Sequence, residues 1–577
     1  MKDKKNFFGM RLGGKSTSAV LIFLILLFSI YILIPQTTHH LMTVGDDWSF
    51  HWNRFYEAAM QIKNHKYNLF QSIYGFNQSG RVVNGVYGAP FAYLHGVLLL
   101  IVKTWYKAEL FSSFLCLSTA GVGMYLLTRY CKVPYAISFA SGLIYMSSVP
   151  VVIYITNQTI RSWGTAFLPV TVIPLIRMVV RKKEQINPFW LGGSFALLLS
   201  VHNLTAAFWI ICSIPFILTA WYFSQEKQTL CINLLFSAIV ALGLTSIMLA
   251  VLYELHGNIF IPPALNPDLG GGTINLSMTL PSQNSYGVIL SLIITSQIVF
   301  IFIAWSKNGL LNKVISISGS FFFFISTSLI PWNYLASHFP ILQILQFPRR
   351  FAPFAILLLL LGFALSLGKI ISNENTILNR GIHALVVAIS ILCVTLAYNL
   401  DNEAAALWRE NIVSQNLAFN STYKNSNVFK AVRFTSPDYL PSNTNVNVNS
   451  FDGGLAYQSE VLNNPIHVKR SVTKSAALKL TWNQRSRQDN LVLPIIVYKQ
   501  SIVRLNGKLI PKAERKLTSI GALIISAHKG TNTVVVGYKP TILFYLSIVV
   551  NVIAYVFFFF YCIWSFLRKT YFIKVHN

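Results

Sequence analysis

The chain has 577 residues, of which 54% are hydrophobic and 11% charged, with a mean hydropathy of +0.53. Soluble globular chains contain about 25% charged residues, so this composition excludes an ordinary soluble enzyme and indicates a polytopic membrane protein. The 46 Lys and Arg against 18 Asp and Glu, a net charge of +28, lie mainly in loops between hydrophobic segments, so we expect anionic lipid or anionic polymer as a partner, and no nucleic acid.

The chain opens with a basic tail, residues 1–17, followed by the apolar stretch 18–35, and no small-residue cleavage site follows this stretch. We interpret it as an uncleaved first span with a cytoplasmic N-terminus. Eleven further apolar runs are long enough to cross about 30 Å of hydrocarbon: 108–128, 134–152, 163–180, 189–205, 206–223, 230–254, 287–305, 314–330, 352–370, 381–398 and 541–566. The sequence therefore predicts a mainly α fold, a polytopic transmembrane helical bundle with about 12 spans.

The stretch 91–103 (FAYLHGVLLLIVK) is apolar for only about 13 positions, too few for a full crossing. Counting it as a span would place Arg181, Lys182 and Lys183 outside, against the positive-inside rule. We therefore interpret it as an interfacial or re-entrant helix. With that choice the C-terminus is cytoplasmic, like the N-terminus, and the protein is a multi-pass protein of the cell membrane.

Three long segments fall on the predicted outer side: residues 36–90, 255–286 and 399–540. The last is large enough to form a domain. Its second half alternates apolar and polar residues and has turn signals at Asn506-Gly507 and Lys529-Gly530, which indicates antiparallel β structure. The predicted organisation is a cytoplasmic tail 1–17, a transmembrane domain 18–398 with the first outer loop 36–90, an extracellular β-rich, β-sandwich-like lobe 399–540, a last span 541–566 and a cytoplasmic tail 567–577.

Acidic residues are so rare in this chain that those near the membrane are functional candidates. The first outer loop begins with Asp46 and Asp47, followed by His51 and Arg54. If residues 48–62 form a helix, then Asp47, His51 and Arg54 share one face. One interpretation is that an aspartate only caps this helix and that its Trp and Phe residues are interfacial anchors. The other is a carboxylate that deprotonates an acceptor hydroxyl, or holds a cation, beside basic groups that bind phosphate.

Further polar side chains fall at the predicted outer ends of other spans: Arg161, His202, Arg349 and Arg350. They lie on the same side as Asp47, so we expect them to line one cleft with it. Arginine is well shaped to bind phosphate through two parallel hydrogen bonds. The alternatives are that His202 is a structural residue at a helix end and that Arg349 or Arg350 extends to lipid headgroups.

Known cofactor motifs are missing from the sequence. It has no Cys or His cluster with metal-ligand spacing, no P-loop and no dinucleotide fingerprint. The only metal site that the residues leave open is a divalent cation on Asp46 or Asp47, with phosphate oxygens completing its coordination. The six cysteines lie in or beside apolar runs, so we expect packing residues and no disulfide framework.

Four short motifs occur in an order that resembles a known family: Asp47-Trp48-x-Phe50-His51-x-Asn53-Arg54, Asn84-Gly85-Val86-Tyr87-Gly88, Arg161-Ser162-x-Gly164 and Gln346-Phe347-Pro348-x-Arg350-Phe351. They are similar to bacterial multi-spanning proteins labelled 6-pyruvoyl-tetrahydropterin synthase-related, close to the YfhO-type proteins. Such proteins resemble the GT-C class of glycosyltransferases, with a catalytic acid in the first outer loop and a polyprenyl-phosphate sugar as donor. The resemblance covers residues 45–350 and, more loosely, the β-rich lobe.

The resemblance implies a role for each matching residue. Asp47 matches the first-loop acid and His51 its companion, so these two are the predicted catalytic residues, with Asp46 as a second candidate acid. Arg54, Arg161, Arg349, Arg350 and His202 are the predicted phosphate or donor ligands. The chain departs from the family at Thr165, where a Glu is usual, and at Arg349, where a Trp is usual. The first change removes a second acid, and the second adds to phosphate binding.

These features predict a membrane glycosyltransferase that moves a sugar from a polyprenyl-phosphate donor to a cell-envelope acceptor at the outer leaflet. Residues 399–540 contain 18 Lys and Arg against 8 Asp and Glu, so we expect the acceptor to be an anionic envelope polymer or glycan. Two alternatives stay open: a lipid or polysaccharide transporter, and a non-catalytic envelope assembly protein with a degenerate GT-C fold.

Overall fold

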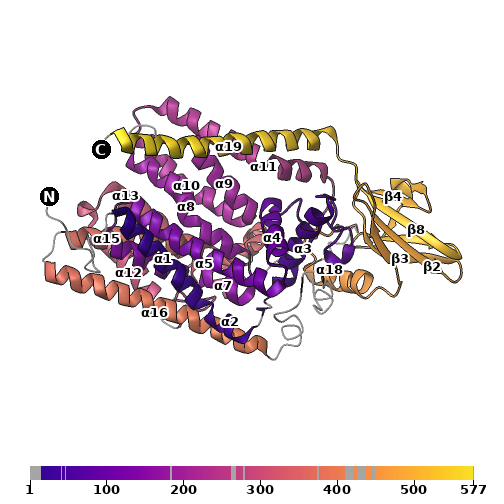
Figure 1. Ribbon diagram of the computed structural model, residues 1–577, viewed down its shortest axis with the longest axis horizontal. Coiled ribbons are helices and arrows are strands. Elements are labelled where there is room, and N and C mark those ends of the chain that lie inside the picture. Colours follow the sequence, from indigo (N-terminus) through magenta and orange to yellow (C-terminus); the bar gives the residue numbers. More distant parts are fainter. Residues whose placement is uncertain are drawn as a thin grey trace.

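The computed structural model describes residues 14–40, 42–43, 45, 47–181, 185–261, 268–276, 280–372, 376–409, 422, 424, 436–443 and 449–575. Most of these residues form helices, which pack into an elongated bundle, and a smaller β-lobe extends from one end of it (Figure 1). We refer to that end as the lobe end.

Eight of the described helices are long and apolar enough to cross a membrane. They are α1 (Gly14–Ile32), α5 (Trp105–Tyr130), α8 (Arg161–Val180), α10 (Asn203–Phe223), α11 (Lys227–Glu254), α15 (Ala352–Ser372), α16 (Thr376–Arg409) and α19 (Ile542–Val575). The pair α6 (Tyr135–Met146) and α7 (Val149–Asn157) is bent by 42° and adds a ninth if it is one broken span. These helices agree with the expectation of a polytopic membrane protein.

Three other predicted spans form apolar helices that are shorter than a full crossing requires. They are α9 (Pro188–Val201), α12 (Gly287–Ile303) and α13 (Leu310–Ser326), each of 14 to 17 residues. Each predicted span thus coincides with an apolar helix, but the number of crossings, about 12 by hydropathy, stays a prediction. The helix α4 (Ala89–Val102) has 14 residues, which agrees with its interpretation as an interfacial or re-entrant element.

The helical part also contains α2 (Ile34–His39), α3 (Trp48–Asn64), α14 (Trp332–His338), α18 (Ser450–Tyr457) and the 3-10 turns at Phe76–Gln78, Gly270–Gly272, Pro340–Leu345 and Pro348–Phe351. The helix α16 differs from its prediction because it continues to Arg409. The predicted lobe boundary at residue 399 therefore falls inside a helix. Most of residues 410–448, the first half of the predicted lobe, lie outside the described residues.

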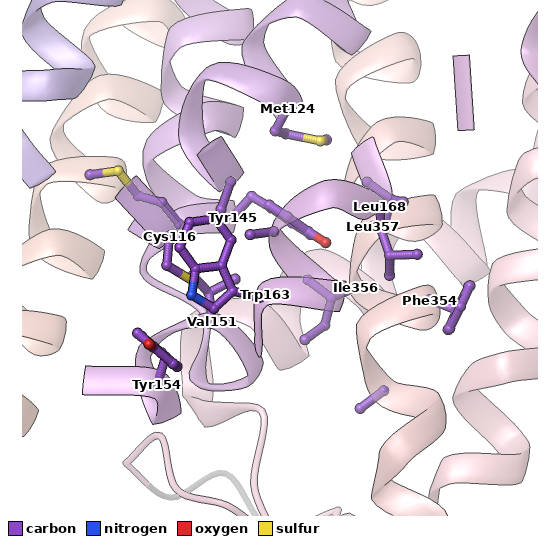
Figure 2. Close-up of a cluster of buried hydrophobic side chains, with 14 of the residues drawn as sticks. Cys116, Met124, Tyr145, Val151, Tyr154, Trp163, Leu168, Phe354, Ile356 and Leu357 are labelled. Atoms are coloured by element: carbon purple, nitrogen blue, oxygen red, sulfur yellow. The ribbon is translucent and has the colours of Figure 1, made fainter. Parts of the chain in front are cut away.

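The bundle core is formed where α5, α6, α7, α8 and α15 meet (Figure 2). Buried side chains from all five helices fill it: Cys116, Met124, Tyr145, Val151, Tyr154, Trp163, Leu168, Phe354, Ile356 and Leu357. Small residues allow α5 and α6 to approach closely, since a Cβ on Gly142 would lie 2.8 Å from the carbonyl oxygen of Gly121. All six cysteines are free thiols.

The β-lobe consists of two antiparallel sheets. The five-stranded sheet has the order β1-β2-β8-β4-β5 and the three-stranded sheet has the order β3-β7-β6. The strands are β1 (Lys469–Val472), β2 (Leu478–Gln484), β3 (Gln488–Ile496), β4 (Ile502–Leu505), β5 (Lys508–Ile510), β6 (Lys516–Leu517), β7 (Ala522–Ala527) and β8 (Gly530–Gly537). Alternate residues of both sheets bury into one shared core, which confirms the expected antiparallel β structure of this lobe.

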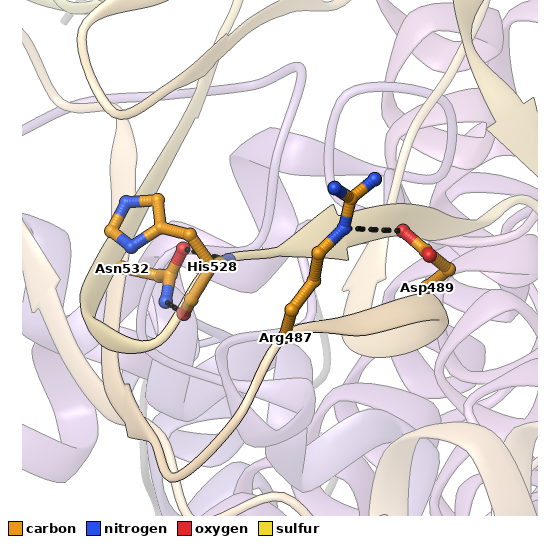
Figure 3. A network of polar contacts seen from close by, with 4 residues as sticks. All are labelled: Arg487, Asp489, His528 and Asn532. Atoms are coloured by element: carbon orange, nitrogen blue, oxygen red, sulfur yellow. Dashed lines mark hydrogen bonds and ion pairs between the residues drawn. The ribbon is translucent and has the colours of Figure 1, made fainter.

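Both predicted turns occur. Asn506 and Gly507 have φ values of 49° and 85° and join β4 to β5, as expected for a two-residue hairpin that needs left-handed residues. Lys529 and Gly530 instead connect β7 to β8, which lie in different sheets. Nearby, the Asn532 side chain donates to the His528 carbonyl oxygen at 2.7 Å (Figure 3), so this connection between the sheets is fixed by a buried amide. Arg487, in the turn between β2 and β3, forms an exposed ion pair with Asp489 of β3.

The lobe rests on residues 79 and 82, which belong to the segment predicted as the first outer loop. The Ile496 N–H donates to the carbonyl oxygen of Ser79 at 2.7 Å. The hydroxyl of Tyr498 accepts from the Val82 N–H at 2.9 Å and donates to the carbonyl oxygen of Tyr439 at 2.9 Å. The lobe therefore contacts residues of the first outer loop that lie close to the candidate site described next.

Candidate functional site

The helix α3 places the residues predicted from the first outer loop. It begins at Trp48, with the exposed Asp47 at its N-cap position, and the carboxylate makes no capping hydrogen bond to the described first turn. One interpretation of the sequence made the Trp and Phe residues of this helix anchors at the membrane interface. They are buried in the protein instead: Trp48, Phe50, Trp52 and Phe55 are each at most 7% exposed. That interpretation is wrong because α3 packs on α4 and α5 inside the protein, with the Trp52 and Trp105 rings in contact.

Arg54 is fully buried, and its guanidinium donates hydrogen bonds to other groups of the protein. Its Nε donates to Asn84 Oδ1 at 3.2 Å, its Nη1 donates to His51 Nδ1 at 3.1 Å, and its Nη2 donates to the carbonyl oxygens of Tyr87 and Gly88. The Tyr87 ring covers the guanidinium at 4.4 Å. Arg54 thus braces the wall of the site and does not line the pocket described below.

Residues 84, 87 and 88 of the Asn84 to Gly88 motif form hydrogen bonds with this arginine. Asn84 also donates from Nδ2 to the carbonyl oxygen of Arg54 at 3.0 Å, so the two residues clamp each other. Gly88 has φ +55°, and a Cβ there would lie 2.4 Å from the carbonyl oxygen of Ser200. Only glycine fits this position without strain, and Gly88 thereby presents its carbonyl oxygen to Arg54.

The bond from Arg54 also fixes the proton of His51. Arginine has no acceptor, so His51 Nδ1 accepts and the neutral ring carries its proton on Nε2. Burial, with Arg54 as the next cause, lowers the pKa of His51 well below its ordinary value. His51 is therefore a neutral hydrogen-bond donor at physiological pH and has no lone pair left for work as a base.

A cavity of about 640 Å³, counted with its open mouth, lies beside these residues. Arg161, His202, Arg349 and Arg350 line it, as predicted for a shared cleft, and we call it the arginine pocket. The rest of the lining comes from apolar and uncharged polar side chains, Thr165 among them, that belong to helices and to the segment before α12. The described lining contains three arginines and no Asp or Glu, so the pocket has the charge of an anion site.

The fold directs helix N-termini at this pocket. Arg161 is the first residue of α8, His202 is the N-cap of α10, and Ala352 and Pro353 begin α15. Each of these helices has 20 or 21 residues, and the partial positive charge of an N-terminus favours a bound anion. The backbone thus adds to the field of the three arginines.

His202 is held as a second neutral donor. Its Nδ1 accepts from the Thr205 N–H at 3.2 Å and lies 2.8 Å from Thr205 Oγ1, so the neutral ring carries its proton on Nε2. Burial, with Arg350 and Arg161 as further causes, lowers the pKa of His202 to about 3. Gly164 makes room for Thr205, because a Cβ on Gly164 would lie 3.0 Å from Thr205 Oγ1.

Arg349 and Arg350 are each oriented by one side-chain hydrogen bond and one aromatic ring. Arg349 Nη1 donates to Asn284 Oδ1 at 2.8 Å, and Arg350 Nη2 donates to Gln346 Oε1. Both guanidinium groups lie over the ring of Phe347. The buried Nε of each arginine makes no hydrogen bond to any described residue. Each arginine therefore keeps donor capacity for a ligand in the pocket.

Asp47 acts on the same site electrostatically, although it is not among the residues that line the arginine pocket. It is an electrostatic neighbour of Arg350 and of Tyr87. The approach depends on Gly45, since a Cβ there would lie 2.2 Å from the Cα of Asn157, in the turn that leads to Arg161. The structure thus brings Asp47, His51 and the pocket arginines to one place. Asp46, the predicted second acid and alternative metal ligand, lies outside the described residues.

Sequence reasoning missed five residues of the site, and only some of them carried a signal. Glu57 accepts backbone N–H bonds from residues 73–75 and fixes the first loop against α3. Its position one helical turn after Arg54 could have identified it as a candidate residue of the site. Tyr87 and Gln346 stood inside quoted motifs without an assigned role. Asn284 and Thr205 gave no signal, because their roles depend on contacts with residues far away in the chain. Among the described residues, no group of three or more His, Cys, Asp and Glu could hold a metal ion.

Comparisons with known proteins give structural similarities only. No family model matches the chain, and no curated protein matches its sequence. Among solved structures, the chain is similar to the Archaeoglobus fulgidus oligosaccharyltransferase in its complex with Zn and sulfate, with a TM-score of 0.39 and 11% sequence identity. The match covers 67% of this chain and 53% of that one, so it spans about half the length of that protein. The resemblance to YfhO-type proteins stays a prediction.

Proposed function

We propose that the protein is a membrane glycosyltransferase of the GT-C type, which moves a sugar from a polyprenyl-phosphate donor to an acceptor outside the cell membrane. One observation carries this proposal: three arginines and a neutral histidine donor line one pocket, and the exposed carboxylate of Asp47 is an electrostatic neighbour of one of these arginines, Arg350. A phosphate group and a proton acceptor are the two requirements of such a transfer.

The reaction that fits this site is a single displacement. Asp47 takes the proton of the acceptor hydroxyl, the hydroxyl oxygen forms a bond to the anomeric carbon, and the bond from that carbon to the phosphate oxygen breaks. The electron pair leaves with the lipid phosphate, and Arg161, Arg349 and Arg350 stabilise its growing negative charge. The Nε2 proton of His202 donates a further hydrogen bond. One displacement inverts the configuration at the anomeric carbon.

His51 and Arg54 act behind this site as positioning residues. Arg54 is enclosed by Asn84, Tyr87 and Gly88, so we assign it no direct phosphate contact. It holds His51 in the tautomer whose Nε2 proton is free to orient Asp47, one helical turn earlier in the chain. Buried, pre-oriented donors of this kind act without reorganising during the reaction.

An apolar cavity next to the arginine pocket supports a lipid-linked donor. It has about 500 Å³ and is lined by side chains of α6, α7, α12 and α16. The two cavities share Val149, Tyr286 and Leu290 as a common wall. An isoprenoid chain in the apolar cavity would bring its phosphate to the arginines, as an amphiphilic ligand requires.

The β-lobe supports an anionic acceptor. Residues 449–540 contain 14 Lys and Arg against 4 Asp and Glu, so the described part of the lobe is strongly basic. A basic surface beside the site raises the local concentration of a polyanion. We therefore propose an anionic envelope polymer or glycan as the acceptor, with the lobe outside and both chain ends inside the cell.

The test is transfer of a labelled sugar by the full chain reconstituted in liposomes. The substrates are a radiolabelled polyprenyl-phosphate sugar and a teichoic-acid-type polymer. We expect labelled polymer with the wild-type protein and at least a hundredfold lower rate with Asp47→Asn. As a matched control, Asp452→Asn removes an exposed carboxylate of α18 and leaves the rate unchanged. Passage of the labelled lipid across the bilayer without transfer identifies a transporter, and neither event identifies an assembly protein; both outcomes contradict the proposal.

A further inference from the structure

The two sheets of the β-lobe differ in their outer faces. The outer face of the three-stranded sheet is partly covered, because Val492 of β3 packs in one cluster with Tyr457 and Val461 of the segment before β1. The outer face of the five-stranded sheet is open. Its central strand β2 buries every second side chain in the lobe core and leaves the others exposed or half-buried on this face: Lys479, Thr481 and Asn483.

The strand register brings three cations close together on this open face. Lys479 and Arg504 both lie opposite Val535 of β8, the strand between theirs, so their Cα atoms are about 10 Å apart, which is two strand spacings. Lys469 lies opposite Thr481 and therefore diagonal to Lys479, at about 7–8 Å. All three cationic side chains are exposed. We call this surface, centred on Lys469, Lys479 and Arg504, the basic face.

No described acid pairs with the cations of the basic face. None of the three forms an ion pair with a described residue, and the outward positions of the five strands contain no Asp or Glu. On the other sheet, by contrast, Asp489 pairs with Arg487 at 3.6 Å and has Lys516 as a further electrostatic neighbour. The positive charge of the basic face is therefore open to an anionic partner.

The remaining outward side chains indicate which kind of polyanion fits. Hydroxyl and amide groups surround the three cations: Ser471, Thr481, Asn483, Thr531 and Thr533. The five strands direct no aromatic ring outward, since Trp482 points into the core. Single-stranded nucleic acids stack their bases on aromatic rings, and surfaces at the membrane interface are rich in Trp and Tyr. The lobe also extends away from the lobe end of the bundle (Figure 1), so a flexible polyanion with free hydroxyl groups fits this face better than either.

The first outer loop connects the basic face to Asp47. Lys66 Nζ donates to the carbonyl oxygen of Val472, the last residue of β1, at 2.9 Å, and Asn68 Nδ2 donates to that of Ala476 at 2.8 Å. Lys66 follows the C-terminal end of α3, whereas Asp47 is the N-cap at its other end. The 17 residues of α3 span about 25 Å, so a distance of this order separates the basic face from Asp47.

We propose that the basic face binds an anionic, hydroxyl-rich polymer and that a bound chain extends about 25 Å along α3 to reach Asp47. This role rests on the proposed function, because it makes the bound polymer the acceptor of the transfer. The face contacts the polymer equally before and during the reaction, so it lowers KM for a long acceptor and leaves kcat unchanged. A short acceptor reaches Asp47 without touching the face and gains nothing from it.

The first experiment measures the binding of fluorescently labelled poly(glycerol phosphate) to the full chain in nanodiscs of uncharged lipid. A triple variant removes the cations of the basic face and places residues that suit a strand there: Lys469→Ser, Lys479→Thr and Arg504→Thr. We expect this variant to bind the polymer at least tenfold more weakly than the wild type.

The matched control removes the same charge from exposed positions outside the five-stranded sheet: Lys499→Ser, Lys516→Thr and Lys539→Ser. Its affinity for the polymer should change less than twofold. Equal losses in the two triple variants would overturn the proposal, because only the net charge of the lobe would then matter. Binding of single-stranded DNA or of anionic-lipid nanodiscs through the basic face, without binding of the polymer, would overturn it as well.

The second experiment compares sugar transfer to the long polymer with transfer to glycerol phosphate, a single repeat unit. The basic-face variant should raise KM for the polymer at least tenfold, with kcat and the transfer to glycerol phosphate unchanged. The same loss with both acceptors would contradict the proposal. Polymer binding that depends on the basic face, in a wild-type protein that transfers no sugar, would support the face as a binding site and contradict the proposed function.

Discussion

Arg54 and Arg350 show how the surroundings of one residue type decide its role. Arg54 is fully buried, and its nitrogens donate to four groups of the protein. Arg350 lines a pocket, donates to Gln346, and keeps a buried Nε without a partner among the described residues. The first is a structural brace and the second keeps donor capacity beside a pocket, although both were candidates for phosphate binding in the sequence.

This difference predicts different costs for the same substitution. Arg54→Ala leaves two carbonyl oxygens and the Asn84 side chain without their donor, so it should lower the free energy of unfolding by about 3 kcal/mol or more. Arg350→Ala should lower it by less than about 1 kcal/mol. Chemical denaturation of the two variants and the wild type in the same detergent measures both losses of unfolding free energy. Equal losses would show that the assigned roles are wrong.

The two histidines predict a dependence of stability on pH. In the unfolded chain a His has a pKa of about 6.5, whereas burial lowers the pKa of His202 to about 3 and that of His51 well below its usual value. Between these pKa values the unfolded chain binds more protons than the folded chain. Stability therefore falls as the pH drops below about 6.5, by up to about 1.4 kcal/mol per pH unit for each histidine.

His202→Asn isolates one of these contributions. The Asn side chain can still accept the Thr205 N–H as an N-cap, but it does not titrate. Between pH 7 and pH 5 the melting temperature of this variant should fall less than that of the wild type. Parallel curves for the two proteins would contradict a His202 that stays neutral in the folded protein.

The residue pattern predicted part of this site. The spacing of His51 and Arg54 correctly indicated that they meet on one helical face, because helix periodicity is a local property; that Asp47 shares this face stays a prediction. The use of Arg54 as a brace was not predictable, since it depends on Asn84 and Gly88, about thirty residues away in the chain. The tautomers of His51 and His202 could not be predicted from the sequence either, because they depend on hydrogen bonds in the folded structure.

At the scale of elements, the site depends on where helices begin. The helices α8, α10 and α15 all start at the arginine pocket. The hydropathy pattern located each of these helices within a few residues because they are long and apolar. It did not show that their starts converge, and it missed the extension of α16 to Arg409, which carries Asp401 to the N–H of Gln36.

Gly45 allows the segment before α3 to lie close to the end of α7. A Cβ at Gly45 would lie 2.2 Å from the backbone of Asn157, so Gly45→Ala must displace either the start of the first loop or the turn before Arg161. Transfer of sugar should fall at least tenfold, because small displacements of reacting groups are costly. Gly309→Ala is the matched control, since a Cβ there meets no atom within 4 Å. The same loss in both variants would contradict this packing role.

At the scale of the whole molecule, the sequence indicated a membrane bundle with a β-rich lobe before the last helix, and the structure has this arrangement (Figure 1). Composition and alternation reveal such classes because they follow from burial in lipid and in a sheet. The contact between lobe and site was not predictable. It rests on single hydrogen bonds, such as those of Tyr498 to Val82 and Tyr439. Periodic patterns in the sequence do not predict bonds of this kind.

The central claim is that the arginine pocket binds the phosphate of a lipid carrier. The most direct measurement is the affinity of the full chain in nanodiscs for polyprenyl phosphate, compared with the uncharged polyprenol of the same length. We predict that the wild-type protein binds the phosphate at least tenfold more tightly than the alcohol, and that Arg350→Ala removes most of this difference. Equal affinities for the two lipids, or an unchanged preference in Arg350→Ala, would contradict the account.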